Sequence, residues 1–341
     1  MNLQTHINFD CGDALSDATI VTFLKHPNIE VVRQGIALLE SLCEEDELVF
    51  KRIIGEVQIT KWGLTLSTPF SEASHHPLLP LELLLLLARQ NHPEVHLVQQ
   101  LNLDDLAMDV LPSSVDSLVN LRGLSLDENP LVDLPDTLGR LPHLEHLSLM
   151  DTNIHQVPEV IGRCKHLKDL RMALNNLSEL PSFVGRLSRL ESLEMRMTGV
   201  RRLPPEICRL SHLKFLHCGA GRLEELPIEI GQLRSLEQLV LQGNRLTTLP
   251  ESIGQLSQLK RLWLGGNPLL ALPEELVQLK NLEKLYLLYP NATSEVPVLP
   301  EGLRALPATT TVVLHANHLD LIERASKMFS TVEIVDPEAL F

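Results

Sequence analysis

Residues 236–256 read LEQLVLQGNRLTTLPESIGQL, and this stretch decides the fold. Moving 23 residues in either direction returns the same pattern, with apolar residues at positions 1, 4, 6 and 11 of each unit and proline at position 15. Successive units start at residues 98, 121, 144, 167, 190, 213, 236, 259 and 282. A fixed period of this length indicates a chain built from one stacked structural unit.

The pattern LxxLxLxxNxL is typical of a leucine-rich repeat solenoid, an α/β fold. Each unit is expected to place one short strand at positions 3–7, so that successive strands form a curved parallel sheet of ten strands. Apolar side chains at positions 1, 4, 6 and 11 turn inward and stack into one core, where each buried leucine contributes roughly 1.5–3 kcal/mol. The sequence therefore predicts a solenoid over residues 98–319.

Two other positions support each turn of the solenoid. Asparagine at position 9 is expected to satisfy backbone groups of neighbouring turns as a ladder, which Leu106, Gly221 and Pro290 interrupt. Proline at position 15 presets the backbone and removes a donor that a strand would need. The residues after it suit a short helical turn.

The ninth unit departs from the period, because Leu299-Pro300 comes four residues late, after an insertion within 289–297. Counting resumes at Leu303 and gives a tenth strand around Val312. The remaining residues, 320–341, are expected to cap the solenoid with an amphipathic helix over 319–328 and a strand over 331–335.

Residues 1–97 are expected to form a mainly helical segment that caps the other end. Helices are predicted over 16–25, 29–44 and 46–54, and short strands or a hairpin within 58–79. A leucine-packed helix over 81–90 is expected to cover the core of the first repeat, because a solenoid end must be sealed.

Composition and net charge indicate which classes of partner and which cellular compartment to expect. The 341 residues carry a net charge of −15, which disfavours nucleic acid as a partner. The chain shows no signal peptide at its start and no apolar run long enough to cross a membrane. Its five cysteines are scattered, as in reduced intracellular proteins. We therefore expect a cytoplasmic protein, or one delivered into a host cytoplasm, with no membrane contact.

The LPxxIGxLxxLxxLxLxxNxL form resembles the 23-residue repeats of Ras-binding scaffolds, of plant intracellular Ras-group repeat proteins and of some bacterial effectors. The resemblance covers residues 98–319. It implies a protein that binds other proteins, but the shared residues are structural, so it implies no binding site.

Specificity must come from the variable strand positions, where side chains alternate away from the core onto the concave face. The first three repeats are acidic there, with Asp104, Asp127 and Asp151, and the last ones are apolar and aromatic. Tyr289 is expected to join the aromatic end. Aromatic residues and arginine clustered on an exposed sheet are typical of a binding hot spot. The predicted partner-binding residues are Arg171, Glu194, Arg196, Phe215, His217, Val240, Arg261, Trp263, Lys284 and Tyr286.

Catalytic signals are poor, and no cofactor or metal is expected. Gly219-Ala220-Gly221 falls inside a repeat and not in a nucleotide-binding loop. His75-His76 lacks the spaced partners of a zinc site, and His315 and His318 are expected at the surface or in the core.

The sequence therefore predicts a non-enzymatic module that binds a protein on the concave face. One alternative is a bacterial-type effector or ubiquitin-ligase-associated protein, because Cys11-Gly-Asp13 matches the Cys-x-Asp motif of bacterial repeat-containing ubiquitin ligases. Another is an inhibitor or immunity-type protein whose acidic repeats mask a basic partner.

Overall fold

The computed structural model describes residue 24, residues 32–34, 36, 37 and 39, and the ranges 57–60, 63–66, 79–89, 93–289 and 297–335. The chain separates into two compact units, residues 1–99 and residues 100–341.

The first unit holds an antiparallel hairpin and a helix. Strands β1 (Val57–Thr60) and β2 (Gly63–Leu66) form the hairpin, as expected for this region. Helix α4 (Leu79–Arg89) is apolar almost all round, and it is followed by the 3-10 helix η2 (Pro93–Leu97). The one acidic residue of α4, Glu82, is buried and accepts a hydrogen bond from Nε of Arg33 at 2.8 Å.

The helical predictions for the first unit are confirmed only in part. The described residues before the hairpin, 24, 32–34, 36, 37 and 39, are helical, and α4 matches the expected helix over 81–90. The predicted helix over 46–54 lies outside the described residues, as do the rest of those over 16–25 and 29–44. The sealing of the first repeat by this unit stays a prediction.

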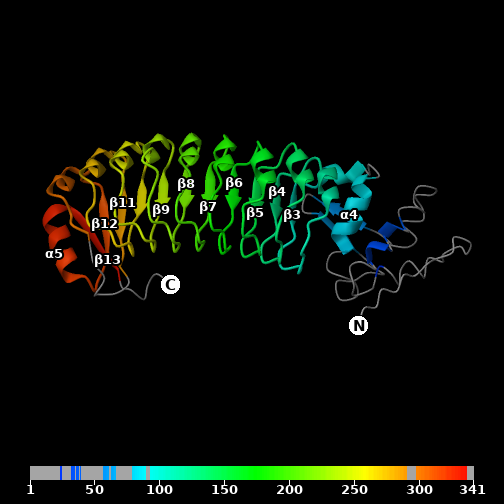
Figure 1. Cartoon of the computed structure of the whole chain (residues 1–341), viewed down its shortest axis with the longest axis horizontal. Coiled ribbons are helices and arrows are strands. Elements are labelled where there is room, and N and C mark those ends of the chain that lie inside the picture. The colour runs from blue at the N-terminus through cyan, green and yellow to red at the C-terminus, as the bar shows by residue number, and fades with distance from the viewer. Residues whose placement is uncertain are drawn as a thin grey trace, which may run out of the picture. The chain divides into compact units, whose positions relative to one another are not determined.

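The second unit is one parallel sheet of eleven strands whose order follows the chain (Figure 1). Ten strands come from the ten repeats, as predicted, and the tail supplies the eleventh. The strands are β3 (Gln100–Asn102), β4 (Gly123–Ser125), β5 (His146–Ser148), β6 (Asp169–Arg171), β7 (Ser192–Glu194), β8 (Phe215–His217), β9 (Gln238–Val240), β10 (Arg261–Trp263), β11 (Lys284–Leu287), β12 (Thr311–His315) and β13 (Thr331–Val335).

A short 3-10 helix follows the position-15 proline in each of the first nine repeats, and these helices line up along the top edge of the unit in Figure 1, above the strands. They are η3 (Ser113–Ser117), η4 (Asp136–Arg140), η5 (Glu159–Arg163), η6 (Ser182–Arg186), η7 (Pro205–Arg209), η8 (Ile230–Gln232), η9 (Glu251–Gln255), η10 (Glu274–Gln278) and η11 (Glu301–Ala305). Helix α5 (Leu319–Met328) and β13 complete the tail over the residues expected for them.

The strand phase is the predicted one, because position-4 residues pair with each other and point into the core. Leu262 lies opposite Leu285, and both are fully buried. Most strands, however, end at position 5 and not at position 7. The chain turns at position 8, which has a positive φ in the first eight repeats, from Asp105 (φ 53°) to Gly266 (φ 66°).

The asparagine ladder is present and buried where the sequence has asparagine. Oδ1 of Asn129 accepts hydrogen bonds from the backbone N–H groups of Leu106 and Met108, at 3.1 and 2.9 Å. Its Nδ2 donates to the carbonyl groups of Leu103 and Leu126, at 2.7 and 3.0 Å. It also donates to the carbonyl group of Asp127 at 3.0 Å, so one side chain joins two repeats through five backbone groups.

Charged residues of alternating sign occupy position 2, just before each strand. Glu145 lies between two cations, with Oε1 2.6 Å from Nη1 of Arg122 and Oε2 2.8 Å from Nζ of Lys168. Further along, Nζ–Oε2 distances of 2.7 Å join Lys214 to Glu191 and Lys260 to Glu237. The full row is Arg122, Glu145, Lys168, Glu191, Lys214, Glu237, Lys260 and Glu283.

Candidate partner-binding surface

The outer face of the sheet carries positions 3, 5 and 7, the positions that the sequence predicted to turn away from the core. Its aromatic centre is the pair Trp263 on β10 and Tyr286 on β11, which occupy equivalent positions on paired strands. Their rings are stacked, with centroids 4.6 Å apart and planes 4° apart. Both side chains are half-buried, so part of this apolar plate faces solvent.

Two cations stand beside the stacked pair. Lys284 lies with Nζ 5.9 Å from the centroid of the Tyr286 ring and 2.9 Å from Oε2 of Glu333 on β13. The hydrogen bond to Glu333 is the largest cause that raises the pKa of Lys284. Arg261 precedes Trp263 by two residues and is exposed, and no partner carboxylate pairs with it among the described residues.

Phe215 and His217 lie on β8 and are half-buried, with their rings in an edge-to-face arrangement and centroids 5.8 Å apart. Burial lowers the pKa of His217, although the carboxylate of Glu194 acts in the opposite direction. Val240 lies between His217 and Trp263 on the sheet but is only 7% exposed. The larger side chains on the two flanking strands leave Val240 little surface for a partner, which corrects its expected place in the exposed row.

The arginines of the middle repeats form ion pairs with carboxylates two positions earlier in the chain. The imidazoles of His146 and His217 approach the same two carboxylates from adjacent strands, with Nδ1 4.0 Å from Oδ2 of Asp169 and 3.8 Å from Oε1 of Glu194. Nε of Arg171 lies 3.0 Å from Oδ2 of Asp169, and Nε of Arg196 lies 2.9 Å from Oε1 of Glu194. Arg171 remains exposed, and Glu194 and Arg196 are half-exposed. These pairs hold the guanidinium groups in fixed directions while leaving them accessible.

Tyr289 does not belong to this surface. Its side chain is 1% exposed, and the ring packs edge-to-face against His318 with centroids 5.8 Å apart. Its carbonyl oxygen lies 2.6 Å from Nδ1 of His315 and 3.3 Å from Nε2 of His318, and both histidines are buried. The expectation that Tyr289 joins the aromatic end was wrong, because the residue lies beyond the strand, in the core.

The acidic repeats also differ from a simple exposed patch. Oδ1 of Asp104 accepts a hydrogen bond from the Asp127 N–H at 2.9 Å. Oδ1 of Asp127 accepts hydrogen bonds from the Met150 N–H at 2.7 Å and from the Ser148 hydroxyl at 2.6 Å. Burial is the largest influence on Asp127 and raises its pKa. Asp104 and Asp127 thus stabilise the ends of the strands, and only Asp151 of the three is fully exposed.

The remaining points from the sequence are the possible metal ligands, the absence of an apolar run long enough to cross a membrane and the Cys-x-Asp motif. No group of three or more histidine, cysteine or acidic residues is placed to hold a metal ion within the described ranges. The helices of those same ranges include none that is both long and apolar enough to cross a membrane. Cys11-Gly-Asp13 and His75-His76 lie outside the described residues.

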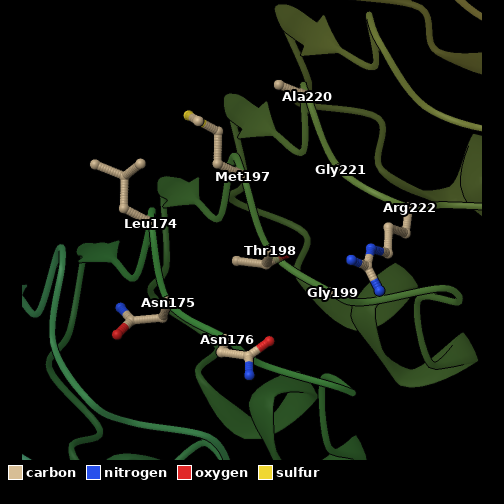
Figure 2. A pocket seen from close by; sticks show the side chains of 9 residues that line it. All are labelled: Leu174, Asn175, Asn176, Met197, Thr198, Gly199, Ala220, Gly221 and Arg222. Atoms are coloured by element: carbon tan, nitrogen blue, oxygen red, sulfur yellow. The ribbon is translucent and has the colours of Figure 1, made fainter.

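Sequence reasoning missed one feature, an open pocket at the ends of β6, β7 and β8 (Figure 2). Its lining residues occupy positions 8–10 of three successive repeats, directly after the outer-face positions. The break in the asparagine ladder at Gly221 was a signal for it in the sequence.

Comparison with known proteins agrees with this architecture. A family model described as a leucine-rich repeat region matches residues 206–317. This chain has a leucine-rich repeat fold. A search of curated protein sequences found no match.

Three solved structures resemble this chain. The ectodomain of the Arabidopsis thaliana receptor kinase GASSHO1/SCHENGEN3, in complex with CASPARIAN STRIP INTEGRITY FACTOR 2, is 25% identical with a TM-score of 0.52 over 70% of this chain and 27% of the receptor. The plant peptide hormone receptor RGFR1 in complex with RGF2 is 22% identical with a TM-score of 0.50 over 65% of this chain and 41% of the receptor. The protein LIC12759 of Leptospira interrogans is 27% identical with a TM-score of 0.49 over 70% of this chain and 72% of that one. The chain therefore spans less than half the length of either receptor.

Proposed function

We propose that this protein is a non-enzymatic interaction protein that binds another protein on the outer face of strands β6–β11. The observation that carries the proposal is the half-exposed stack of Trp263 on Tyr286, with the exposed cation Arg261 beside it. Large aromatic side chains and arginine are the residues most often responsible for binding energy in protein interfaces. A partner that suits this surface presents an apolar side chain to the stack and a hydrogen-bond acceptor to Arg261.

Three further features support this surface. Phe215 and His217 extend the aromatic character to β8, and Arg171 on β6 and Arg196 just after β7 add accessible guanidinium groups. The GASSHO1/SCHENGEN3 ectodomain, which shares the fold, was solved with a bound factor. Three cysteines in the repeats, Cys164, Cys208 and Cys218, are buried free thiols. Their reduced state agrees with a cytoplasmic location, which we include in the proposal.

The test compares partner capture by the wild-type protein and by the double variant Arg261→Ala, Trp263→Ala. Proteins captured from native lysate are identified by mass spectrometry, and the affinity of a purified partner is then measured for each variant. Removal of a hot-spot side chain costs about 2 kcal/mol or more, which is a roughly 30-fold loss of affinity.

The matched control is the double variant Ile228→Ala, Leu270→Ala. Both residues are exposed and apolar, at 75% and 66%, but neither lies on a strand of the sheet. The control is expected to keep wild-type affinity. Equal affinity of the Arg261→Ala, Trp263→Ala variant and the wild type would refute the proposed surface.

A second candidate function follows from the rim of the first three repeats. Asp105, Glu128 and Asp151 occupy position 8 of successive repeats, and all three are exposed. Such a row attracts a basic partner, as an inhibitor of a basic protein requires. Binding that weakens with salt and disappears in Asp105→Asn, Glu128→Gln, Asp151→Asn would favour this function over the aromatic surface.

A further inference from the structure

The pocket beside β6, β7 and β8 is a cavity of about 360 Å³. It lies at the ends of these strands, where the chain leaves the sheet (Figure 2). Its lining includes Leu174 and Met197 on one side, Arg222 on the other, and the backbone of Gly199 and Gly221. This volume falls in the range of small-ligand sites in proteins, about 300–1,000 Å³.

The pocket lies where the asparagine ladder is interrupted. In the intact part of the ladder, the N–H groups at positions 9 and 11 of one repeat donate to the position-9 asparagine of the next. In the fifth repeat these donors belong to Thr198 and Val200, and the next position 9 is Gly221. Glycine supplies no side-chain acceptor for these two N–H groups.

No neighbouring side chain replaces the missing acceptor. The Thr198 hydroxyl donates to the carbonyl oxygen of Met195 at 3.0 Å, and Oδ1 of Asn244 accepts from the N–H of Leu223 at 2.9 Å. Within the described repeats, no acceptor lies in hydrogen-bonding geometry to the N–H of Thr198 or Val200. Both residues are buried, at 7% and 1% exposed, and a buried donor without an acceptor costs about 1–3 kcal/mol.

The sides of the pocket add a charge and an apolar rim. Arg222 is exposed and has no ion-pair partner among the residues that the structure describes. Leu174 and Met197 are 37% and 50% exposed, on neighbouring repeats. In Figure 2 their side chains project on the side of the pocket away from Arg222.

We propose that this pocket is a binding site for a carboxylate in an extended peptide, such as a glutamate side chain followed or preceded by an apolar residue. One carboxylate oxygen takes the place of the missing asparagine oxygen and accepts the hydrogen bonds of the Thr198 and Val200 N–H groups. The guanidinium of Arg222 pairs with the carboxylate charge, and Leu174 and Met197 contact the apolar neighbour. The site does not depend on the Trp263 surface, and isolated peptides test it separately.

The test follows the backbone amide signals of Thr198 and Val200 by NMR in the full-length protein. The probes are two blocked tripeptides, acetyl-Ala-Leu-Glu-amide and acetyl-Ala-Leu-Gln-amide, which differ in the charge of the last side chain. The glutamate peptide is expected to shift both amide signals with an affinity about tenfold or more above that of the glutamine peptide, because charge-assisted hydrogen bonds are the stronger ones. Equal effects of the two peptides, or no shift with either, would overturn the proposal.

Two variants and a control locate the binding. Gly221→Asn supplies the ladder oxygen once the Asn244 amide, whose Oδ1 would lie 3.0 Å from the new Cβ, has shifted slightly. This variant is expected to abolish binding of the glutamate peptide, and Arg222→Gln is expected to weaken binding about tenfold. Arg245→Gln is the matched control, because Arg245 occupies the same position of the next repeat, beside the intact asparagine Asn244. If both Gly221→Asn and Arg222→Gln bind the glutamate peptide with wild-type affinity, the proposal is contradicted. It is also contradicted if inorganic phosphate shifts the amide signals of Thr198 and Val200 and the glutamate peptide does not.

Discussion

The indole of Trp263 stacks on the ring of Tyr286 from the next repeat, with planes 4° apart. The two residues are directly paired across β10 and β11, so the 23-residue period itself brings the rings into contact. A stack built in this way is rigid before any partner arrives. Little conformational entropy is lost when it binds, which favours affinity.

We expect the contributions of the Trp263 and Tyr286 rings to the free energy of unfolding to depend on each other. Trp263→Ala, Tyr286→Ala and the double variant form a double-mutant cycle, measured by chemical denaturation. Aromatic pairs contribute about 0.5–1.5 kcal/mol beyond area burial, and the cycle should return a coupling energy of this size. A cycle on Trp263 and Phe215, which lie two strands apart, is the control and should give a coupling energy near zero.

The asparagine ladder predicts an unequal response to asparagine substitutions. Asn129→Ala leaves the N–H groups of Leu106 and Met108 without their acceptor, so it should lower the free energy of unfolding by about 2–4 kcal/mol. Asn176→Ala, at an exposed position, should change it by less than about 0.5 kcal/mol. Similar losses in the two variants would show that the ladder adds little to stability.

The period made most of this fold predictable from the sequence. The sequence pattern predicted the core positions, the ten repeat strands, their phase and the tail elements. Every repeat buries its leucines at the same positions, so a shift in strand phase would expose all of them at once. The binding surface was less predictable, since exposure at one position depends on the size of side chains on both neighbouring strands. Val240 is buried between two larger residues, and Tyr289 turns into the core beyond the end of its strand. The pocket at Gly221 was missed because the break in the ladder, although visible in the sequence, indicates a missing acceptor and does not by itself predict a cavity.

The positive φ at position 8 predicts which substitutions the turns tolerate. Gly243 has a φ of 67°, so Gly243→Ala should lower stability by about 1–2 kcal/mol. Ala220→Gly, at the same position of the previous repeat (φ 52°), should be close to neutral, because relief of strain offsets the greater freedom of the unfolded chain. Thermal unfolding of the two variants checks this, and a loss for Ala220→Gly as large as that for Gly243→Ala would contradict it.

His217 predicts a dependence of stability on pH. Burial lowers its pKa in the folded protein, so the unfolded chain binds the proton more readily. The contribution of neutral His217 to stability is therefore complete above the unfolded pKa of about 6.5 and is lost as pH falls below it. His217→Gln should show a smaller loss of stability between about pH 7 and pH 5, in denaturation curves measured across that range. His155→Gln, at an exposed position, serves as the control and should follow the wild type.

The alternating charges at position 2 determine which deletions of repeats the array tolerates. Excising the 23 residues that contain Lys168 would bring Glu145 beside Glu191, and two carboxylates would face each other where a cation now separates them. Excising two consecutive repeats, those of Lys168 and Glu191, would instead bring Glu145 beside Lys214 and preserve the sequence of signs. In this respect the repeats act as pairs. Deleting an even number of repeats keeps opposite charges side by side at the new junction, and deleting an odd number brings like charges together.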